Sequence, residues 1–435
     1  MTASDSISLL DNWAVSGDNI EEFKDVNRKL AEATHCDKEK VSEIPYFTSY
    51  ARAYHEAVKK MGETGKVPFF VLSKETLEKV QMSGGKIQCG YVLDEKLPSE
   101  ALKEESFNGN GLMVKFNGRF VPFSDLTFGG FLQKAGLDGA GVYGDSLIRN
   151  ELMIDNIYQS QKNKAFQFVW RETEDPDTGK KNMKIFGVMS SAYSYIPQTT
   201  ICDVYDRLAV GEDFNHPVAK QWSIDHSITR IYSEYPDEAE DGLIPGVELR
   251  TSDIGASSFM VYATMRQEKS NRYVIIASVS RIHKGNNDTE ELLKKVNEEI
   301  FPELRVYPTL FKELDTPIVP PLVTNEDKKE QVEKLKGIYN KVFKSMKSGL
   351  SKKRKKELKK ALIAEINPDR EYTWRDIAEQ LISVPDRVIG LDDTTSVFQA
   401  FRKDMGRAPF LLKDIKDKVV PFTTKENDEE EVILA

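Results

Sequence analysis

The residues best suited to chemistry in this sequence are basic, and they are concentrated in one run. The run is Lys352-Lys353-Arg354-Lys355-Lys356-Glu357-Leu358-Lys359-Lys360, and it follows Lys344 and Lys347 in the same predicted helical region. Basic side chains neutralise phosphates and release the counterions condensed on a polyanion, so they bind it independently of sequence. The run therefore predicts a nucleic-acid-binding surface. A solvated helical face that offsets an acidic protein is the alternative.

Four arginines on or beside predicted strands would extend this surface if their faces coincide. They are Arg230, Arg250, Arg266 and Arg281. Four aromatic residues would offer stacking platforms for bases if exposed, although packing in the core is their more common role. They are Trp222, Tyr232, Tyr262 and Tyr273.

An acidic and then apolar segment closes the sequence. Its residues are Asp428, Glu429, Glu430, Glu431, Val432, Ile433 and Leu434. This layout is similar to the tails of bacterial single-stranded-DNA-binding proteins, which dock partners and compete with DNA. We predict a tail that docks replication or recombination proteins, with a disordered solubilising tail as the alternative.

Other patterns that could carry chemistry are weak. The segment 139–144, GAGVYG, matches the dinucleotide-binding string, but a predicted helix rather than a strand precedes it. His35-Cys36 has no second ligand pair at zinc spacing. Asp225 and His226 would point to opposite faces of a strand, so a packed histidine is the better interpretation. A hydrolase or nuclease is disfavoured, because no pair of acidic residues stands out as a metal site. We predict no catalytic residue, metal or cofactor.

The composition is that of a globular protein with separated charges. Of 435 residues, 40% are hydrophobic and 30% charged, with a formal net charge of −9. Negative charge gathers at 237–241 and 426–431 and positive charge at 344–360, so the net charge does not exclude nucleic acid. Three widely spaced cysteines favour a reducing cytoplasm. Asp5 and Asp11 argue against a signal peptide, and no run is long enough to span a membrane.

Both helices and strands are predicted to position these residues. We predict an α+β fold with a mixed or antiparallel sheet, flanking helices and a helical C-terminal extension. The expected ranges are a mainly helical region at 1–110, an α+β core at 111–316, a helical region with the basic helix at 317–425 and the acidic tail at 426–435. Pro317, Pro320 and Pro321 mark the boundary after the core.

Local patterns predict particular elements. Asn117-Gly118 joins two strand-like runs in a hairpin, and further hairpins are predicted for 166–189 and 259–282. Alternation over 222–232 predicts one long strand. The segment 184–208 predicts a strand followed by a helix from Thr200 whose apolar face is buried. The residues expected in the core there are Ile185, Val188, Ile201, Val204 and Leu208.

Four segments, in order, resemble the phage/plasmid-like protein family, a domain of unknown function found on phages, plasmids and prophages. They are PFSDLTFGGFLQKAGL (122–137), KIFGVMSSAYSYIPQTTICDVYDRL (184–208), ELRTSDIGASSFMVYATMR (248–266) and EYTWRDIAEQLISVP (371–385). The family often continues from the third segment into a Cys-x-Asn-Gly type sequence, where this chain has QEKSNRYVII. The resemblance implies a mobile-element protein of the bacterial cytoplasm. It implies no established activity and assigns no catalytic residue.

We therefore expect a phage- or plasmid-encoded protein of DNA metabolism. It would bind single-stranded DNA or replication and recombination intermediates without catalysis. The alternative is a protein-interaction or assembly component, such as a virion, scaffold or host-defence inhibitor protein, that binds no nucleic acid. The sequence leaves the oligomeric state open, with a homo-oligomer among the options.

Overall fold

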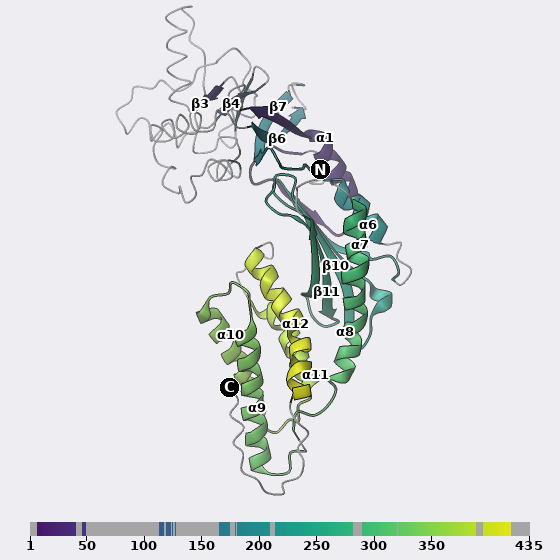
Figure 1. Cartoon of the computed structure of the whole chain (residues 1–435), viewed down its shortest axis with the longest axis vertical. Coiled ribbons are helices and arrows are strands. Elements are labelled where there is room, and N and C mark those ends of the chain that lie inside the picture. Colours follow the sequence, from purple (N-terminus) through teal and green to yellow (C-terminus); the bar gives the residue numbers. More distant parts are fainter. Residues whose placement is uncertain are drawn as a thin grey trace, which may run out of the picture. The chain divides into compact units, whose positions relative to one another are not determined.

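The computed structural model describes residues 7–40, 46–48, 113–116, 119–122, 124, 127, 165–174, 179, 181–208, 214–281, 289–319, 321–388 and 395–418. These residues form three β-sheets, helices beside them and a C-terminal group of helices (Figure 1). The predicted α+β fold class is confirmed. The acidic tail and the segment 139–144 lie outside the described residues.

Two compact units divide the chain, and their residues interleave. The first unit holds Met1–Tyr235, Val247–Val261 and Val279–Asn297, and the second holds Pro236–Gly246, Tyr262–Ser278 and Glu298–Ala435. This division differs from the ranges expected from the sequence, because the second unit takes in two segments from the middle of the chain. Most of the range 1–110 lies outside the described residues.

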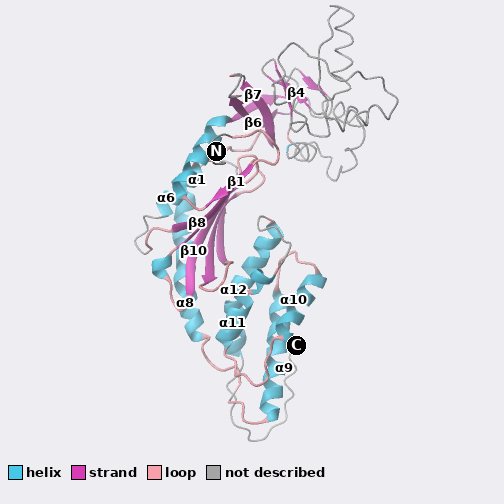
Figure 2. Cartoon of the chain, turned by 180° about the vertical axis from the view of Figure 1, so that it is seen from behind, coloured by secondary structure: helices cyan, strands magenta, loops and turns pink. Residues whose placement is uncertain are grey.

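The largest sheet has six strands in the order β1-β8-β9-β10-β11-β12. They are β1 (Ala14–Gly17), β8 (Val218–Asp225), β9 (Thr229–Glu234), β10 (Leu243–Thr251), β11 (Phe259–Gln267) and β12 (Val274–Arg281). Figure 2 shows β8 and β10 within this sheet. The neighbouring strands β11 and β12 confirm the hairpin predicted for 259–282. Strand β11 lies inside the sheet, and β12 lies at its edge.

Two three-stranded sheets have the orders β2-β6-β7 and β3-β4-β5. Their strands are β2 (Thr34–Lys40), β6 (Ala165–Glu174), β7 (Lys181–Ser190), β3 (Tyr46–Thr48), β4 (Met113–Phe116) and β5 (Arg119–Pro122). The antiparallel pairs β4–β5 and β6–β7 confirm two predicted hairpins. Phe116 pairs with Arg119, as a two-residue connection requires.

The long strand predicted for 222–232 is wrong, because the chain reverses in the middle of this range. β8 ends at Asp225, and β9 begins at Thr229 and runs antiparallel to it. Asp225 Oδ1 accepts hydrogen bonds from Ser227 N at 2.6 Å and Ile228 N at 2.7 Å. An aspartate that binds the backbone two residues further on favours a turn. This local bond outweighs the alternation of apolar and polar residues.

The strand and helix predicted within 184–208 are β7 and α6 (Thr200–Leu208). All five residues expected in the core are buried, namely Ile185, Val188, Ile201, Val204 and Leu208. Tyr205 Oη donates a hydrogen bond to Pro217 O at 2.8 Å, which fastens α6 to the segment before β8. Among the described residues, the first unit also contains the helices α1 (Ile20–Ala33) and α7 (Thr289–Lys295).

The second unit contains the C-terminal helices. They are α8 (Phe301–Glu313), α9 (Asn325–Ser345), α10 (Lys352–Ala364), α11 (Trp374–Ile382) and α12 (Ser396–Lys418). Of these, α9, α10, α11 and α12 lie together in Figure 1. Capping boxes begin α9 at Thr324 and α11 at Thr373, each with an aspartate at the third helical position. These starts explain why the helical pattern of the sequence divides where it does.

Helix α12 packs closely against the edge strand β12. Gly406 approaches Ile275 so closely that a Cβ atom would overlap the carbonyl oxygen of Ile275. Arg407 Nη1 donates a hydrogen bond to Ile276 O at 2.9 Å. A glycine lets the two backbones approach, and a helix that covers an edge strand removes its exposed hydrogen-bonding groups.

Candidate nucleic-acid interface

The predicted basic run forms the first part of α10 and lies beside the C-terminal end of α9. Two lysines of the run join the helices. Lys355 Nζ donates a hydrogen bond to Met346 O at 3.0 Å, and Lys359 Nζ donates to Asn340 Oδ1 at 2.6 Å. Both views of the chain show α9 and α10 side by side (Figures 1 and 2). The run and the end of α9 therefore make one surface.

Exposed lysines dominate this surface. They are Lys341, Lys344, Lys347, Lys352, Lys353, Lys356 and Lys360, and we call them the basic surface. None of them forms an ion pair with a carboxylate in the described part of the chain. Two lysines earlier in α9 are paired: Lys328 Nζ lies 2.6 Å from a carboxylate oxygen of Asp369, and Lys336 Nζ lies 2.6 Å from one of Glu333. Positive charge is therefore in excess at this end of the helix pair, where Glu357 is the one carboxylate of the run.

The first turn of α10 adds to this positive charge. Backbone N–H groups at the start of a helix carry partial positive charge, so carboxylates are favoured there. The first turn of α10 has no acidic residue and instead contains Lys352, Lys353 and Arg354. Ser351 caps the helix, with its Oγ accepting a hydrogen bond from Arg354 N at 3.3 Å. A bound anion would stabilise this arrangement.

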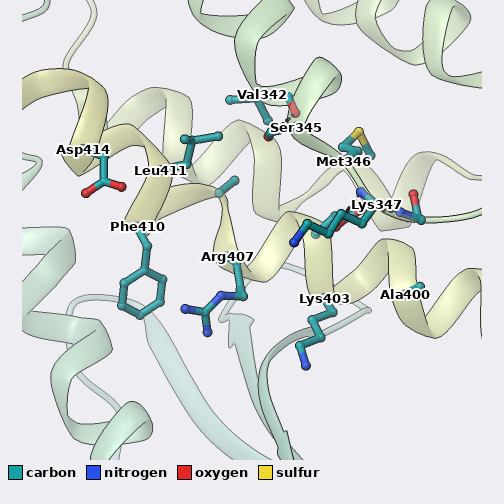
Figure 3. Close-up of a pocket in the computed structure, with 13 residues that line it drawn as sticks. Val342, Ser345, Met346, Lys347, Ala400, Lys403, Arg407, Phe410, Leu411 and Asp414 are labelled. Carbon is teal, nitrogen blue, oxygen red and sulfur yellow. Dashed lines mark hydrogen bonds between the residues drawn. The ribbon is translucent and has the colours of Figure 1, made fainter. Parts of the chain in front are cut away.

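A groove of about 680 Å³ adjoins the basic surface, between the end of α9 and one face of α12 (Figure 3). Lys347 lines the groove and also belongs to the basic surface. Asp404 also lines the groove, and its carboxylate accepts hydrogen bonds from Lys347 N at 3.2 Å and Ser348 N at 2.7 Å. Lys403 and Arg407 line the α12 side. The volume is in the range of small-ligand sites, roughly 300–1,000 Å³.

The four predicted arginines differ in how far they are enclosed. Arg230 and Arg250 are buried, at 7% and 8% exposure, and Arg230 Nε lies 3.3 Å from Glu248 Oε1. Arg266 donates to backbone carbonyl oxygens near it, including a 3.0 Å bond from Nη1 to Ser270 O. Arg281 is half-buried at the end of β12. Strand alternation gave no signal of which arginines are enclosed.

The aromatic residues considered as stacking platforms are all buried. They are Trp222, Tyr232, Tyr262 and Tyr273, none more than 9% exposed. Core packing is therefore their role in this structure. Any stacking of bases must come from other side chains.

Sequence reasoning missed a buried ion pair in the first unit. Arg171 Nη2 lies 3.0 Å from Oδ1 and 2.8 Å from Oδ2 of Asp253, and both side chains are 0% exposed. Arg171 Nε also donates to Thr34 Oγ1 at 3.2 Å. A charged residue inside an alternating strand was the available signal, but the partner on a distant loop could not be identified from spacing.

His226 lies in the same cluster and is the packed histidine that the sequence predicted. Its ring centroid lies 3.9 Å from that of Phe186 and 5.0 Å from that of Trp13. Arg171 Nη1 donates to His226 Nδ1 at 2.5 Å. Burial and the Arg171 charge lower the pKa of His226 to about 2, so the ring is neutral. The ion pair of Arg171 with Asp253 holds the loop 252–255 against β6.

The described residues contain little that could hold a metal or act as a nucleophile. No group of three or more His, Cys, Asp or Glu side chains within them could bind a metal ion. Burial raises the pKa of Cys36 to about 11, so this thiol stays protonated at neutral pH. His35 stacks on Trp170 with ring centroids 4.1 Å apart. In the same part of the chain, no helix has the length and apolarity to cross a bilayer.

Comparisons of the chain with protein-family models, curated proteins and solved structures found no match. The basic surface and the groove are therefore the features of the molecule that bear on its function.

Proposed function

We propose that this protein binds nucleic acid through the basic surface, without catalysis. The observation that carries the proposal is a set of exposed lysines on α9 and α10 that form no ion pair with a described carboxylate. A face that served only solubility would be expected to pair lysines with carboxylates one turn away, as the middle of α9 does at Glu333 and Lys336. The run in α10 has one carboxylate, Glu357, and it forms no ion pair with a described lysine. The geometry favours an external polyanion as the partner.

We further propose that the setting is DNA metabolism of a phage or plasmid in the cytoplasm of a bacterial host. The support is the resemblance of four sequence segments to the phage/plasmid-like family. Docking of replication or recombination proteins by the acidic tail belongs to the same proposal, and that tail lies outside the described residues.

A salt titration with matched variants tests the proposal. The basic variant replaces Lys352, Lys353, Lys356 and Lys360 with Gln. The control variant replaces four exposed lysines elsewhere, namely Lys220, Lys269, Lys329 and Lys418, and changes the net charge equally. Binding to a labelled single strand and to a matched duplex is measured between about 50 and 200 mM salt.

Wild-type protein and the control variant should bind with affinity that falls steeply as salt rises. The basic variant should bind more weakly, with a slope smaller by roughly 0.7–0.9 for each phosphate that the protein no longer neutralises. Equal weakening in both variants would mean that net charge, not this surface, attracts DNA. No binding by the wild type at low salt would favour the alternative, a protein-interaction or assembly component.

A further inference from the structure

We propose that the groove between α9 and α12 binds one nucleotide of a single strand, with its phosphate at Lys403 and Arg407 and its base on apolar side chains nearer Asp414. This inference rests on the proposed function and adds the class of ligand. The basic surface holds the phosphate backbone of any nucleic acid, whereas the groove accepts a base that has left its stack.

The two cations of α12 are held in place and retain free donor capacity. Lys403 Nζ donates to Ser278 Oγ at 2.9 Å, and Arg407 Nη1 donates to Ile276 O at 2.9 Å. An ammonium has three N–H donors and a guanidinium has five, so each side chain can bind an anion as well. The nearest carboxylate oxygen of Glu303 is 4.0 Å from Arg407 Nη1. The remaining N–H donors of Lys403 and Arg407 can therefore bind a phosphate.

The charges around the groove favour an anion at this end. Burial and the Arg407 charge lower the pKa of Lys403, as expected where two cations share a poorly solvated place. In Figure 3, Lys403 and Arg407 project from the same side of α12, and Lys347 extends across from the segment after α9. Asp404 does not cancel these charges fully, because two backbone N–H groups already bind its carboxylate. A phosphate would relieve the repulsion among the cations.

The rest of the groove suits a flat apolar group. Val342, Met346, Phe410 and Leu411 line it. The Arg407 guanidinium carbon lies 4.9 Å from the centre of the Phe410 ring, so a planar cation and an aromatic ring are already paired. Bases stack on such surfaces with little regard to sequence. The groove thus supplies the stacking that the buried aromatic residues of the sheet cannot.

Asp414 indicates which end of the groove would hold the base of the nucleotide. It lies seven residues after Arg407 on α12, which is a rise of about 10 Å along the helix. That separation is comparable with the length of a nucleotide from phosphate to base. The carboxylate repels the phosphate from this end and can accept a hydrogen bond from the amino group of cytosine, which thymine lacks. The base therefore points towards Asp414.

A duplex cannot occupy the groove in this way, because its bases are paired and stacked. Extruding one base from a duplex costs a few kcal/mol, whereas a single strand needs no such step. The groove therefore confers a preference for single strands that the basic surface alone does not.

The first experiment compares single-strand and duplex binding by full-length variants. Lys403→Gln and Arg407→Gln should each weaken binding of an oligodeoxycytidine strand about tenfold, as release of one held base does, and leave a matched duplex within about twofold. Lys418→Gln, on the same helix outside the groove, should change neither. Equal weakening for strand and duplex, or none at all, would overturn the inference. Thermal unfolding of each variant must match the wild type, and Arg407→Lys, which keeps the charge, should retain part of the binding.

The second experiment tests the groove without a polymer. Saturation-transfer NMR with dCMP should show transfer to the base that disappears in Arg407→Gln, and dTMP should bind less than dCMP. Asp414→Asn should reduce that difference. If the wild type binds no strand but binds dCMP at Arg407, the proposed function fails and the groove site stands. If dCMP does not bind, the groove inference fails, whatever the basic surface does.

Discussion

Arg171 and Asp253 form an ion pair from which solvent is excluded on both sides. The Arg171 Nη2 atom contacts both carboxylate oxygens, at 3.0 and 2.8 Å, and the two side chains are 0% exposed. Attraction between charges is strong in such surroundings, but so is the cost of removing each from water. The pair therefore matters most for what happens when one partner is removed.

Asp253→Ala should destabilise the protein strongly. The change leaves the Arg171 charge buried without its carboxylate, and breaking such a pair costs about 3–5 kcal/mol. Urea unfolding measures the decrease in the free energy of unfolding. Arg207→Ala, which breaks an exposed pair with Glu290, serves as the comparison and should cost far less, because water screens that pair. A similar small decrease for both would show that the buried pair contributes little.

His226 should make stability depend on pH in the acid range. Its folded pKa is about 2, below the value of 6.5 for an ordinary histidine. Between these values the unfolded state binds a proton that the folded state does not, so the free energy of unfolding falls as pH falls below about 6.5. The slope from this group is up to about 1.4 kcal/mol per pH unit.

Urea unfolding of wild type and His226→Gln at about pH 7.5, 6 and 5 measures this effect. The difference in the free energy of unfolding between the two proteins should become smaller as the pH falls, because the variant lacks the histidine that titrates in the unfolded state. A difference that stays constant over this range would contradict a neutral, enclosed His226.

Two glycines in helices should respond oppositely to alanine. A Cβ on Gly406 would overlap the carbonyl oxygen of Ile275, whereas one on Gly337 would have nothing within 4 Å. Gly337→Ala should stabilise the protein by about 0.5–1 kcal/mol through the lower backbone entropy of the unfolded chain. Gly406→Ala should destabilise it by about 1–3 kcal/mol, because backbone must move. Thermal unfolding of both variants tests whether the first is stabilised and the second destabilised.

Local patterns predicted the parts of the fold that depend on neighbouring residues. The apolar face of 200–208 repeats at helical spacing and is buried as α6. The Asn117-Gly118 dipeptide predicted the pairing of β4 with β5. The long strand at 222–232 failed for a local reason too, since the hydrogen bonds of the Asp225 carboxylate reverse the chain. The alternation of apolar and polar residues does not reveal these hydrogen bonds.

The groove could not be predicted, because its walls come from distant parts of the sequence. The basic run was visible as composition, but the 2.7 Å bond from Ser348 N to Asp404, which joins two residues that line the groove, spans 56 residues. The burial of Arg230 depends in the same way on Glu248, a residue of the adjacent strand. Spacing along a chain identifies faces of single elements, whereas sites between elements need the tertiary fold.

A single substitution at Ser351 should separate the stability of α10 from its binding of nucleic acid. Ser351→Asp keeps a good N-cap and places a negative charge beside Lys352, Lys353 and Arg354 at the positive end of the helix. We expect it to raise the free energy of unfolding by about 0.3–1 kcal/mol. The same charge would repel phosphate, so DNA binding at low salt should weaken. Ser351→Asn, an uncharged cap of similar quality, should change neither property. A variant Ser351→Asp that is more stable and binds DNA as well as the wild type would place the bound phosphates away from the first turn of α10.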